Sequence, residues 1–205
     1  MVWRRRPTAM TYNILPKFGG TIILFDGLEV AGFNCGYRGT NQQHKTKPMA
    51  LKLGKSQYES IRRHGVKDYP SECCGVLLGK ADGDAKTVTE VVPLTNLRHD
   101  PAKAQELLPL DDQNKETDKN RFLIDPLDQL RVEKGARARG LDVLGYYHSH
   151  PDHPARPSVY DRDHAWPWYS YVIIAVERGT PKDLTSWILA EDRSAFGAEA
   201  LVIGD

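Results

Sequence analysis

Two histidines separated by one residue, His148 and His150, lie at the end of an apolar run in the second half of the chain. Because side chains alternate between the two faces of a strand, both imidazoles point the same way and can bind one metal ion. Asp161 can supply a carboxylate from the next element, which leaves a fourth position open for water. Three nitrogen or oxygen ligands plus water are typical of a catalytic zinc site. The spacing therefore predicts a zinc hydrolase with one zinc ion (Zn2+) per chain.

A proline-rich connection joins the second histidine to Asp161. Three prolines lie between His150 and Ser158, and each of them restricts the backbone, so the connection should hold metal ligands at a fixed separation. Ser158 is also typical of a helix N-cap, with an acidic residue three positions later. Ser158 and Asp161 therefore either only cap that helix or also belong to the site. Their position soon after His148-Ser149-His150 favours the site.

Hydrolysis at zinc also requires a group that carries protons. A nearby carboxylate can take the proton of the water and deliver it to the leaving amine. Glu72 is the candidate, because it lies where the polar segment 69–71 gives way to the apolar run 73–78, at the mouth of the expected sheet. Taken alone, Glu72 is typical of a surface residue at the start of a strand, and its catalytic role rests on the wider motif.

The elements that position these residues are expected to begin near Met49. Residues 1–48 have no sustained hydrophobic period. Three interpretations of them remain open: an accessory hairpin, a disordered arm, or a translation start placed too far upstream. Residues 49–205 form the predicted compact domain, which is long enough for one hydrophobic core.

Within this domain, helical and strand patterns alternate. A helix is expected over 55–64 with Gly65 as its stop, and a second one from the N-cap Asp125 to Gly140. Residues 94–119 are predicted to form a long mobile loop. Strands are expected over 73–78, 87–92 (ended by Pro93), 121–124, 141–150, 171–176, 186–189 and 198–203. This order predicts an α/β (α+β layered) fold, with a mixed β-sheet flanked by helices.

Composition argues against several function classes. The net charge is +1 over 205 residues, which gives no reason to expect nucleic acid or an anionic membrane surface as a partner. No apolar stretch reaches the roughly 18 residues that span a bilayer, and no signal segment follows the basic start. The three cysteines, Cys35, Cys73 and Cys74, make a poor disulfide framework, so we expect a reducing, cytoplasmic location. Cys73 and Cys74 are expected to be small buried residues.

Three segments share one larger pattern: Pro70-Ser-Glu72-Cys-Cys-Gly75-Val-Leu-Leu-Gly79, Gly145-Tyr-Tyr-His148-Ser-His150-Pro151 and Pro157-Ser158-Val-Tyr-Asp161. Together they resemble the JAMM (MPN+) zinc metallopeptidases, over most of residues 49–190 and with all five signature positions in place. The segment 120–126 and the short chain are most similar to the stand-alone prokaryotic branch. The resemblance implies a JAMM/MPN-like fold with a cytidine-deaminase-like architecture.

The same resemblance implies a role for each of the five residues. His148, His150 and Asp161 would bind zinc, Glu72 would be the general base and acid, and Ser158 would donate a hydrogen bond to the oxyanion.

The resemblance also implies a substrate. The expected partner is a ubiquitin-like or sulfur-carrier protein with a Gly-Gly tail, joined through its last glycine to a cysteine or a lysine. That tail would lie along a sheet edge as an added strand. Tyr146, Trp166 and Trp168 either flank the tail or belong to the core, and the core is the favoured interpretation.

Alternative interpretations remain at this stage. His148-x-His150-x-Asp152-His153 also fits the metallo-β-lactamase fold, in which Asp152 and His153 would hold a second metal. That fold needs further histidines downstream, and only His164 follows, so Asp152 and His153 are expected at the rim of the cleft. A non-catalytic MPN-type scaffold or carrier-protein binding module is a second alternative, and a JAMM-like domain of DNA repair is a third. The sequence leaves the oligomeric state open.

Overall fold

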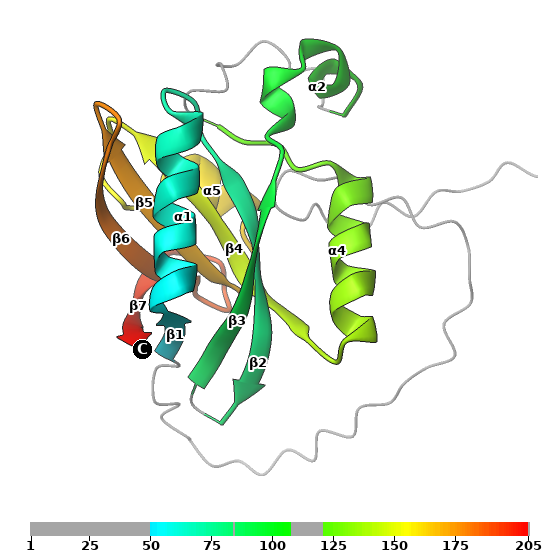
Figure 1. Ribbon diagram of the computed structural model, residues 1–205, viewed down its shortest axis with the longest axis vertical. Coiled ribbons are helices and arrows are strands. Elements are labelled where there is room, and N and C mark those ends of the chain that lie inside the picture. The colour runs from blue at the N-terminus through cyan, green and yellow to red at the C-terminus, as the bar shows by residue number, and fades with distance from the viewer. Residues whose placement is uncertain (1–49, 84, 108–120, 205) are drawn as a thin grey trace, which may run out of the picture.

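The computed structural model describes residues 50–83, 85–107 and 121–204, so the predicted extension over residues 1–48 lies outside the described part. Seven strands and their helices follow one another along the chain (Figure 1). The strands are β1 Ala50–Gly54, β2 Cys74–Asp82, β3 Ala85–Leu94, β4 Asp142–Pro151, β5 Ser170–Glu177, β6 Thr180–Leu189 and β7 Phe196–Gly204. The helices are α1 Lys55–Asp68, α2 Pro101–Leu107, α4 Pro126–Ala138 and α5 Val159–His164, with a 3-10 turn over Leu97–His99.

The strands form one mixed sheet that closes on itself in the order β1-β3-β2-β4-β5-β6-β7. Closure comes from a parallel pairing of β1 with β7, in which Ala50 lies opposite Ala200. A second parallel pairing joins β4 to β5, whereas β2 runs antiparallel to β4. The expected mixed sheet flanked by helices is confirmed, and its closure into a barrel is an addition that the strand pattern did not predict.

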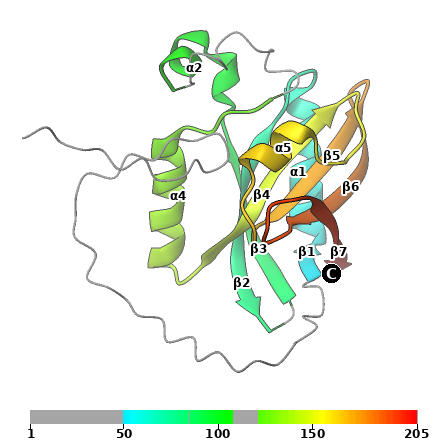
Figure 2. The same cartoon turned by 180° about the vertical axis from the view of Figure 1, so that it is seen from behind.

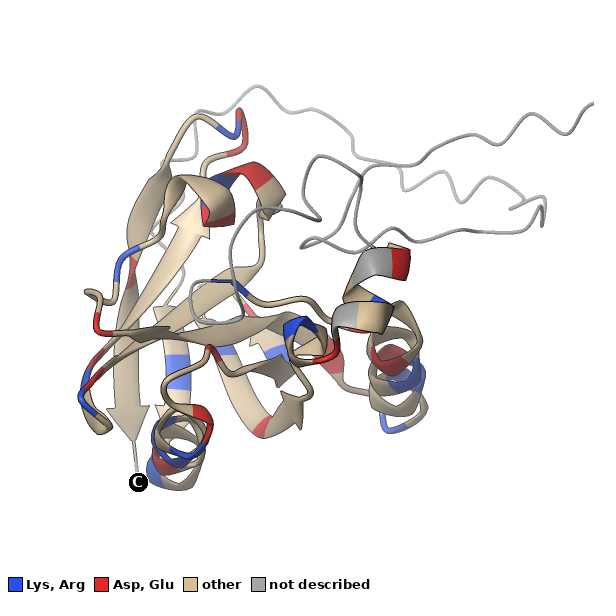
Figure 3. Cartoon of the chain, turned by 90° about the horizontal axis from the view of Figure 1, so that it is seen from above, with Lys and Arg blue, Asp and Glu red and all other residues tan. Residues whose placement is uncertain are grey.

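Helices cover the sheet on both faces. α1 crosses the front of the sheet in Figure 1, whereas α5 lies in front when the molecule is seen from behind (Figure 2). α4 packs beside β2 and β4 through Ala136, which joins Val76 and Leu78 in one buried cluster. Acidic and basic residues are interspersed along the helices and loops (Figure 3).

The main core lies between α1 and the sheet. Ile61 of α1 is fully buried there with Leu77, Tyr147 and Val172. Gly65 was expected to end this helix but lies inside it. A Cβ atom at Gly65 would lie 3.1 Å from Val176 Cγ2 and 3.3 Å from Ile174 Cγ2, so the glycine lets α1 approach β5 closely. The prediction of a stop at this residue is therefore wrong, because the glycine serves packing.

Three other expectations for local structure are also wrong. Residues 121–124 do not form a strand, although Leu123 and Ile124 are buried as the pattern required. Residues 97–107 of the predicted loop form a 3-10 turn and α2 instead, packed through Leu97, Ala104 and Leu123. β3 continues through Pro93. Near Pro93, β3 pairs with β2 along one edge, and among the described residues no strand pairs with its other edge. A proline is tolerated in such an edge position, because its missing N–H then interrupts no ladder.

Other local predictions are confirmed. The Asp125 side chain caps α4 by accepting a hydrogen bond from the Leu127 N–H, and Gly140 follows the helix at a φ of 68°. Cys73 and Cys74 are buried free thiols, whereas Cys35 lies outside the described residues. No helix in the described part of the chain is long and apolar enough to cross a membrane.

A buried polar cluster lies near one end of the barrel. Lys86 of β3, fully buried, donates hydrogen bonds to the Trp168 carbonyl and to Ser170 Oγ. Ser170 Oγ in turn donates to Glu199 Oε1 over 3.0 Å, and Ser186 Oγ donates to Glu199 Oε2 over 2.6 Å. This Lys86–Glu199 cluster ties β3, β5, β6 and β7 together by polar contacts rather than by apolar packing.

Candidate active site

β4 brings the two histidines to one face of the sheet. The strand runs between β2 and β5, with His148 opposite Ile173 and His150 opposite Ala175. Both imidazoles are buried, and their Nε2 atoms lie 3.0 Å apart. The strand geometry therefore agrees with the prediction that both imidazoles lie on one face.

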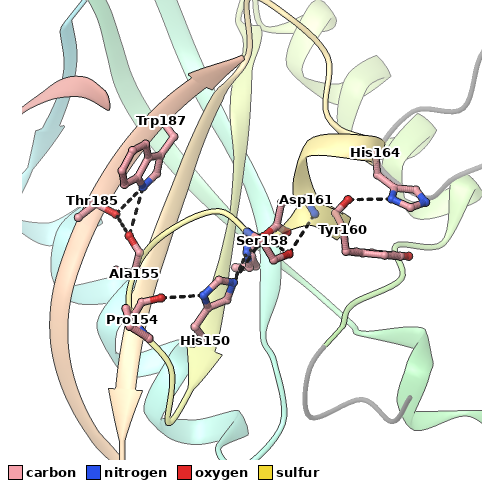
Figure 4. A network of polar contacts seen from close by, with 10 residues as sticks. His150, Pro154, Ala155, Ser158, Tyr160, Asp161, His164, Thr185 and Trp187 are labelled. Carbon is pink, nitrogen blue, oxygen red and sulfur yellow. Dashed lines mark hydrogen bonds and ion pairs between the residues drawn. The ribbon is translucent and has the colours of Figure 1, made fainter. Parts of the chain in front are cut away.

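Asp161 reaches the histidines from the first turn of α5. Its Oδ1 atom lies 3.3 Å from His148 Nε2, and its Oδ2 atom lies 3.6 Å from His150 Nε2. Ser158 is the N-cap of α5 and forms a capping box with Asp161 (Figure 4). The Ser158 N–H and hydroxyl both donate to Asp161 Oδ2, over 2.6 and 2.7 Å. The capping box thus fixes the carboxylate and leaves Oδ1 free to bind a cation.

These three side chains have the right donors and spacing for zinc. A tetrahedral zinc ion with bonds of about 2.0–2.1 Å places its ligand atoms about 3.3 Å apart. The distances among the two Nε2 atoms and the Asp161 oxygens are 3.0, 3.3 and 3.6 Å. No other group of three histidine, cysteine or acidic side chains in the described ranges has such spacing. His148, His150 and Asp161 therefore fit a zinc ion with three protein ligands.

The proline-rich connection orients His150. His150 Nδ1 lies 2.9 Å from the Pro154 carbonyl oxygen, which can only accept, so Nδ1 donates this hydrogen bond and Nε2 is the ring nitrogen that faces His148 and Asp161. The connection is itself fastened to β6, because Thr185 Oγ1 and Trp187 Nε1 both donate to the Ala155 carbonyl (Figure 4). The stiff connection expected from its prolines is thus also anchored to the sheet.

The protonation states of the site suit metal binding. Burial lowers the pKa of His148 to about 4, against the opposing effect of Asp161, so the imidazole is neutral at neutral pH. Burial alone would raise the pKa of Asp161, but the two histidines and the Ser158 N–H lower it below its ordinary value. A neutral imidazole at His148 and a carboxylate at Asp161 are the forms in which these two side chains bind zinc. His148 also stacks on Phe122, with ring centroids 4.9 Å apart.

Glu72 lines a cavity together with His150, one of the three predicted ligands, and with Ser158. The cavity has a volume of about 470 Å³ and is lined by Glu72, Arg121, His150, His153, Pro154, Arg156, Ser158, Val159 and Tyr160. Glu72 is only 4% exposed, and burial followed by the charge of Asp161 raises its pKa well above the ordinary value. Arg121 and Arg98 act in the opposite direction. A buried carboxylate with a raised pKa is the usual form of a general base and acid.

Ser149, the residue between the histidines, joins β4 to the segment that carries Glu72. Its hydroxyl accepts a hydrogen bond from the Cys73 N–H over 2.8 Å, and its own N–H donates to the Cys73 carbonyl over 3.1 Å. Ser149 is fully buried. It therefore sets the separation between Glu72 and the histidines, a function that sequence reasoning did not assign to it.

Asn96 is a second residue that sequence reasoning missed. Its side-chain Nδ2 donates to the carbonyls of Glu72 and Arg121, over 3.0 and 3.1 Å. Its Oδ1 accepts from the N–H groups of Arg98 and Leu123, each over 3.0 Å. One buried amide thus holds four backbone positions around the cavity. A polar residue inside a predicted loop gave no signal of this role.

The structure separates Asp152 from the three predicted ligands. Asp152 has a φ of 54° and accepts hydrogen bonds from the Arg178 N–H and the Tyr69 hydroxyl, over 2.8 and 2.9 Å. It therefore holds the turn after β4, whereas His153 lines the cavity as expected. The group of potential metal ligands found among the described residues does not include either of them. The second metal site of a metallo-β-lactamase fold thus has no counterpart in this part of the chain.

The three aromatic residues weighed as flanks of a substrate tail do not line the cavity. Tyr146 packs in the apolar clusters beside α4 and β5, and its hydroxyl accepts from Gln129. Arg193 lies over the Trp166 ring, and Lys86 lies over the Trp168 ring. Tyr146 therefore agrees with the favoured core interpretation. For Trp168 that interpretation is wrong, because this residue is 46% exposed and lies at the surface.

Known proteins are similar to this chain in sequence and in fold. Residues 54–190 match the family described as prokaryotic homologs of the JAB domain. The chain belongs to this family. The resemblance to JAMM (MPN+) proteins is thereby confirmed, together with the predicted class of fold.

Individual relatives cover most of this JAB domain. A desampylase of Haloferax volcanii is 35% identical over 128 residues, which are 60% of this chain and 78% of that protein. A probable TtuB-protein conjugate cleaving protease of Thermus thermophilus is 30% identical over 129 residues, 63% of this chain and 72% of that protein. A protein of Desulfitobacterium hafniense with a known solution structure is 32% identical, with a TM-score of 0.59 over 76% of this chain and 93% of that one.

Proposed function

We propose that this JAB-domain protein is a zinc-dependent peptidase that hydrolyses the bond after the C-terminal glycine of a ubiquitin-like or sulfur-carrier protein. The observation that carries the proposal is the His148–His150–Asp161 group, whose spacing suits zinc and whose His150 lines one cavity with the buried Glu72. Relatives named as a desampylase and as a TtuB-protein conjugate cleaving protease support a conjugate as the substrate. The buried free thiols Cys73 and Cys74 support a reducing compartment such as the cytoplasm.

In this proposal His148 Nε2, His150 Nε2 and Asp161 Oδ1 hold the zinc ion. When bound, zinc acts as a Lewis acid that lowers the pKa of water and polarises the substrate carbonyl. Glu72 takes the proton of the attacking water and later delivers it to the leaving amine. Its raised pKa suits this double task, because an effective general base must also be able to return its proton near neutral pH.

Ser158 is proposed to stabilise the oxyanion that forms on the attacked carbonyl. Its hydroxyl now donates to Asp161 Oδ2 and accepts from the Asp161 N–H. Donation to an oxyanion requires the hydroxyl proton to turn away from the carboxylate, while the hydrogen bond from the Asp161 N–H keeps the oxygen in place. Such a donor typically contributes about 10²–10³ to the rate. Capping of α5 and oxyanion stabilisation are therefore compatible in one residue.

Zinc content and turnover together test this proposal. The zinc-loaded parent should hold one zinc per chain and cleave a linear fusion of a Gly-Gly-tailed carrier protein. Asp161→Ala should lose both zinc and cleavage, whereas Asp163→Ala, a matched change of an exposed aspartate on the same helix, should retain both. A parent that binds zinc but cleaves no Gly-Gly conjugate would refute the proposed activity and favour the non-catalytic scaffold.

A further inference from the structure

A gap in the closed sheet opens where β6 and β7 diverge. These two strands pair only over residues 186–189 of β6 and 196–199 of β7. Beyond that pairing, residues 180–185 of β6 have β5 along one edge, and residues 200–204 of β7 have β1 along one edge. Within the described residues, no strand pairs with the second edge of either stretch. Such an edge presents backbone N–H and C=O groups to a further strand.

The cavity in this gap runs along the edge of β6. It has a volume of about 590 Å³ and is lined by residues 183–187 of β6 and by Ala198, Glu199 and Leu201 of β7. Consecutive side chains of a strand point to opposite faces, so a cavity that touches an unbroken run of them follows the edge and not one face. Leu184 and Leu201 give it an apolar floor, because both pack against the main core. An extended polypeptide is the ligand that such a groove accepts.

The proline-rich connection joins this groove to the catalytic cavity. Pro154 and Arg156 line both of them, and Ala155 lines the groove. His150 Nδ1 donates to the Pro154 carbonyl over 2.9 Å, while the Ala155 carbonyl is fastened to β6 (Figure 4). The groove therefore begins at a residue in direct contact with a predicted zinc ligand. A chain held in the groove reaches the catalytic cavity by crossing residues 154–156.

The two halves of the proposed substrate differ in what they offer to this groove. The carrier tail ends in glycines, which have no side chain to place between apolar walls. The target protein, by contrast, brings the aliphatic stem of its conjugated lysine and the side chains of the neighbouring residues. An apolar groove that begins beside a zinc ligand therefore suits the target, on the leaving-group side of the scissile bond.

We propose that the groove between β6 and β7 binds an extended segment of the target protein, added as a strand to the free edge of β6. This inference rests on the proposed function and names its substrate class: conjugates at a lysine within a flexible segment, as opposed to a lysine in a helix or a single amino acid. Backbone hydrogen bonds to the edge supply affinity, and Leu184, Trp187 and Leu201 select apolar side chains at alternate positions.

A set of isopeptide substrates with the same Gly-Gly-tailed carrier protein tests this inference. One joins the tail to a single lysine that is capped at both ends. Another joins it to a lysine within a short peptide of alternating valine and threonine. Two more carry that peptide with N-methyl groups on alternate residues, at the odd or at the even positions. For the zinc-loaded parent, we expect kcat/KM to be about tenfold to a hundredfold higher for the unmethylated peptide than for the single lysine.

The two methylated peptides test whether the segment binds as a strand. In an added strand, the N–H groups of alternate residues face the neighbouring strand and the others point away from it. One methylated peptide should therefore lose the advantage over the single lysine, and the other should keep it. Loss in both peptides, or in neither, would overturn strand addition.

A substitution that fills the groove should remove the advantage of the peptide. Ala198 and Ala200 are both exposed on the same face of β7, but Ala198 lines the groove and Ala200 does not. In Ala198→Tyr, the ratio of kcat/KM for the peptide to that for the single lysine should fall close to one, mainly through loss of rate on the peptide. Ala200→Tyr is the matched control and should keep the parent ratio. Zinc content and thermal unfolding of both variants check that the fold and the metal site are intact.

Two other results would contradict the proposal. An unchanged ratio in Ala198→Tyr would overturn it, and if both rates fall together, the groove holds the carrier tail instead. Equal kcat/KM for the peptide and the single lysine in the parent would refute the role of the groove while leaving the peptidase intact.

Failure of the proposed activity gives a different result. If the zinc-loaded parent cleaves none of these substrates, the proposed activity is refuted, and the dissociation constants of the same conjugates then decide about the groove. Tighter binding of the peptide conjugate than of the single-lysine conjugate, lost in Ala198→Tyr, would support the groove. Equal binding of the two conjugates would overturn it.

Discussion

Asn96 provides the sharpest test of how the site is assembled. The side chain is 1% exposed and makes four hydrogen bonds to backbone groups. In Asn96→Ala, the N–H groups of Arg98 and Leu123 lose their acceptor, and the carbonyls of Glu72 and Arg121 lose a donor. Each buried donor left unsatisfied costs about 1–3 kcal/mol. Partial entry of water reduces the sum, so we expect a loss of about 3–4 kcal/mol in the free energy of unfolding.

Two measurements follow from that estimate. Chemical denaturation should show the loss of unfolding free energy directly. For a chain of this size, each kcal/mol lowers the melting temperature by about 2–4 °C, so the melting temperature should fall by about 10 °C. The rate should fall as well, because freeing the Glu72 backbone displaces the proposed base, and a misplacement of about 1 Å can cost about a hundredfold. A variant within 1 kcal/mol of the parent and with an unchanged kcat would refute the role given to Asn96.

Asn96→Asp separates the two halves of this role. Aspartate can still accept from the Arg98 and Leu123 N–H groups but can no longer donate to the Glu72 and Arg121 carbonyls. Its charge near Glu72 should raise the pKa of that carboxyl further, because like charges disfavour ionisation. Since the ionised base is the active form, the acid limb of the kcat/KM profile should move to higher pH than in the parent. An acid limb that does not move would show that position 96 has no electrostatic influence on the base.

Three further predictions concern the base, the turn after β4 and the buried cluster. Glu72→Gln should retain one zinc per chain by metal analysis but lose about 10²–10⁴ in kcat, and turnover close to that of the parent would remove Glu72 from the mechanism. Asp152→Ala should also keep its zinc, whereas loss of one of two metals would restore the metallo-β-lactamase interpretation. Burial lowers the pKa of Lys86 to about 8, so between pH 8 and 10 the unfolded chain holds a proton at Lys86 that the folded chain has lost, and the Lys86 contribution to the free energy of unfolding rises. The buried thiols Cys73 and Cys74 act in the opposite direction in both proteins, so urea denaturation should show the rise as a parent-minus-Lys86→Met difference that is larger at pH 10 than at pH 8.

The sequence was sufficient for those parts of the site in which spacing alone dictates geometry. Two histidines at positions i and i+2 of a strand must share a face, and a serine with an acidic residue three positions later must place the carboxylate at the start of a helix. His148, His150, Ser158 and Asp161 could therefore be located by local rules. Glu72 was located by the family motif, because nothing near it in the sequence says which strand lies beside it.

The remaining parts of the site depend on contacts between distant segments. Asn96 acquires its role only when residues 72, 98, 121 and 123 converge on it, and a polar residue inside a predicted loop carries no sign of that convergence. Gly65 reads as a helix stop unless the side chains of β5 that pack on it are known. The apolar run 121–124 indicated burial correctly, but it could not show that its backbone bonds to the Asn96 side chain and to the Leu97 N–H rather than to a strand.

The closure of the sheet has a consequence for how the protein is made. Ala50 pairs with Ala200, so the strand synthesised first in the described part of the chain waits for the last one before its outer edge is covered. Pairings of such long sequence separation form slowly, because the loop between them must close first. Until β7 leaves the ribosome, β1 and β6 both present unpaired backbone edges, which are templates for association with other chains. Nascent chains interrupted within β7 should therefore aggregate, even though every residue proposed for zinc binding and hydrolysis has already been synthesised.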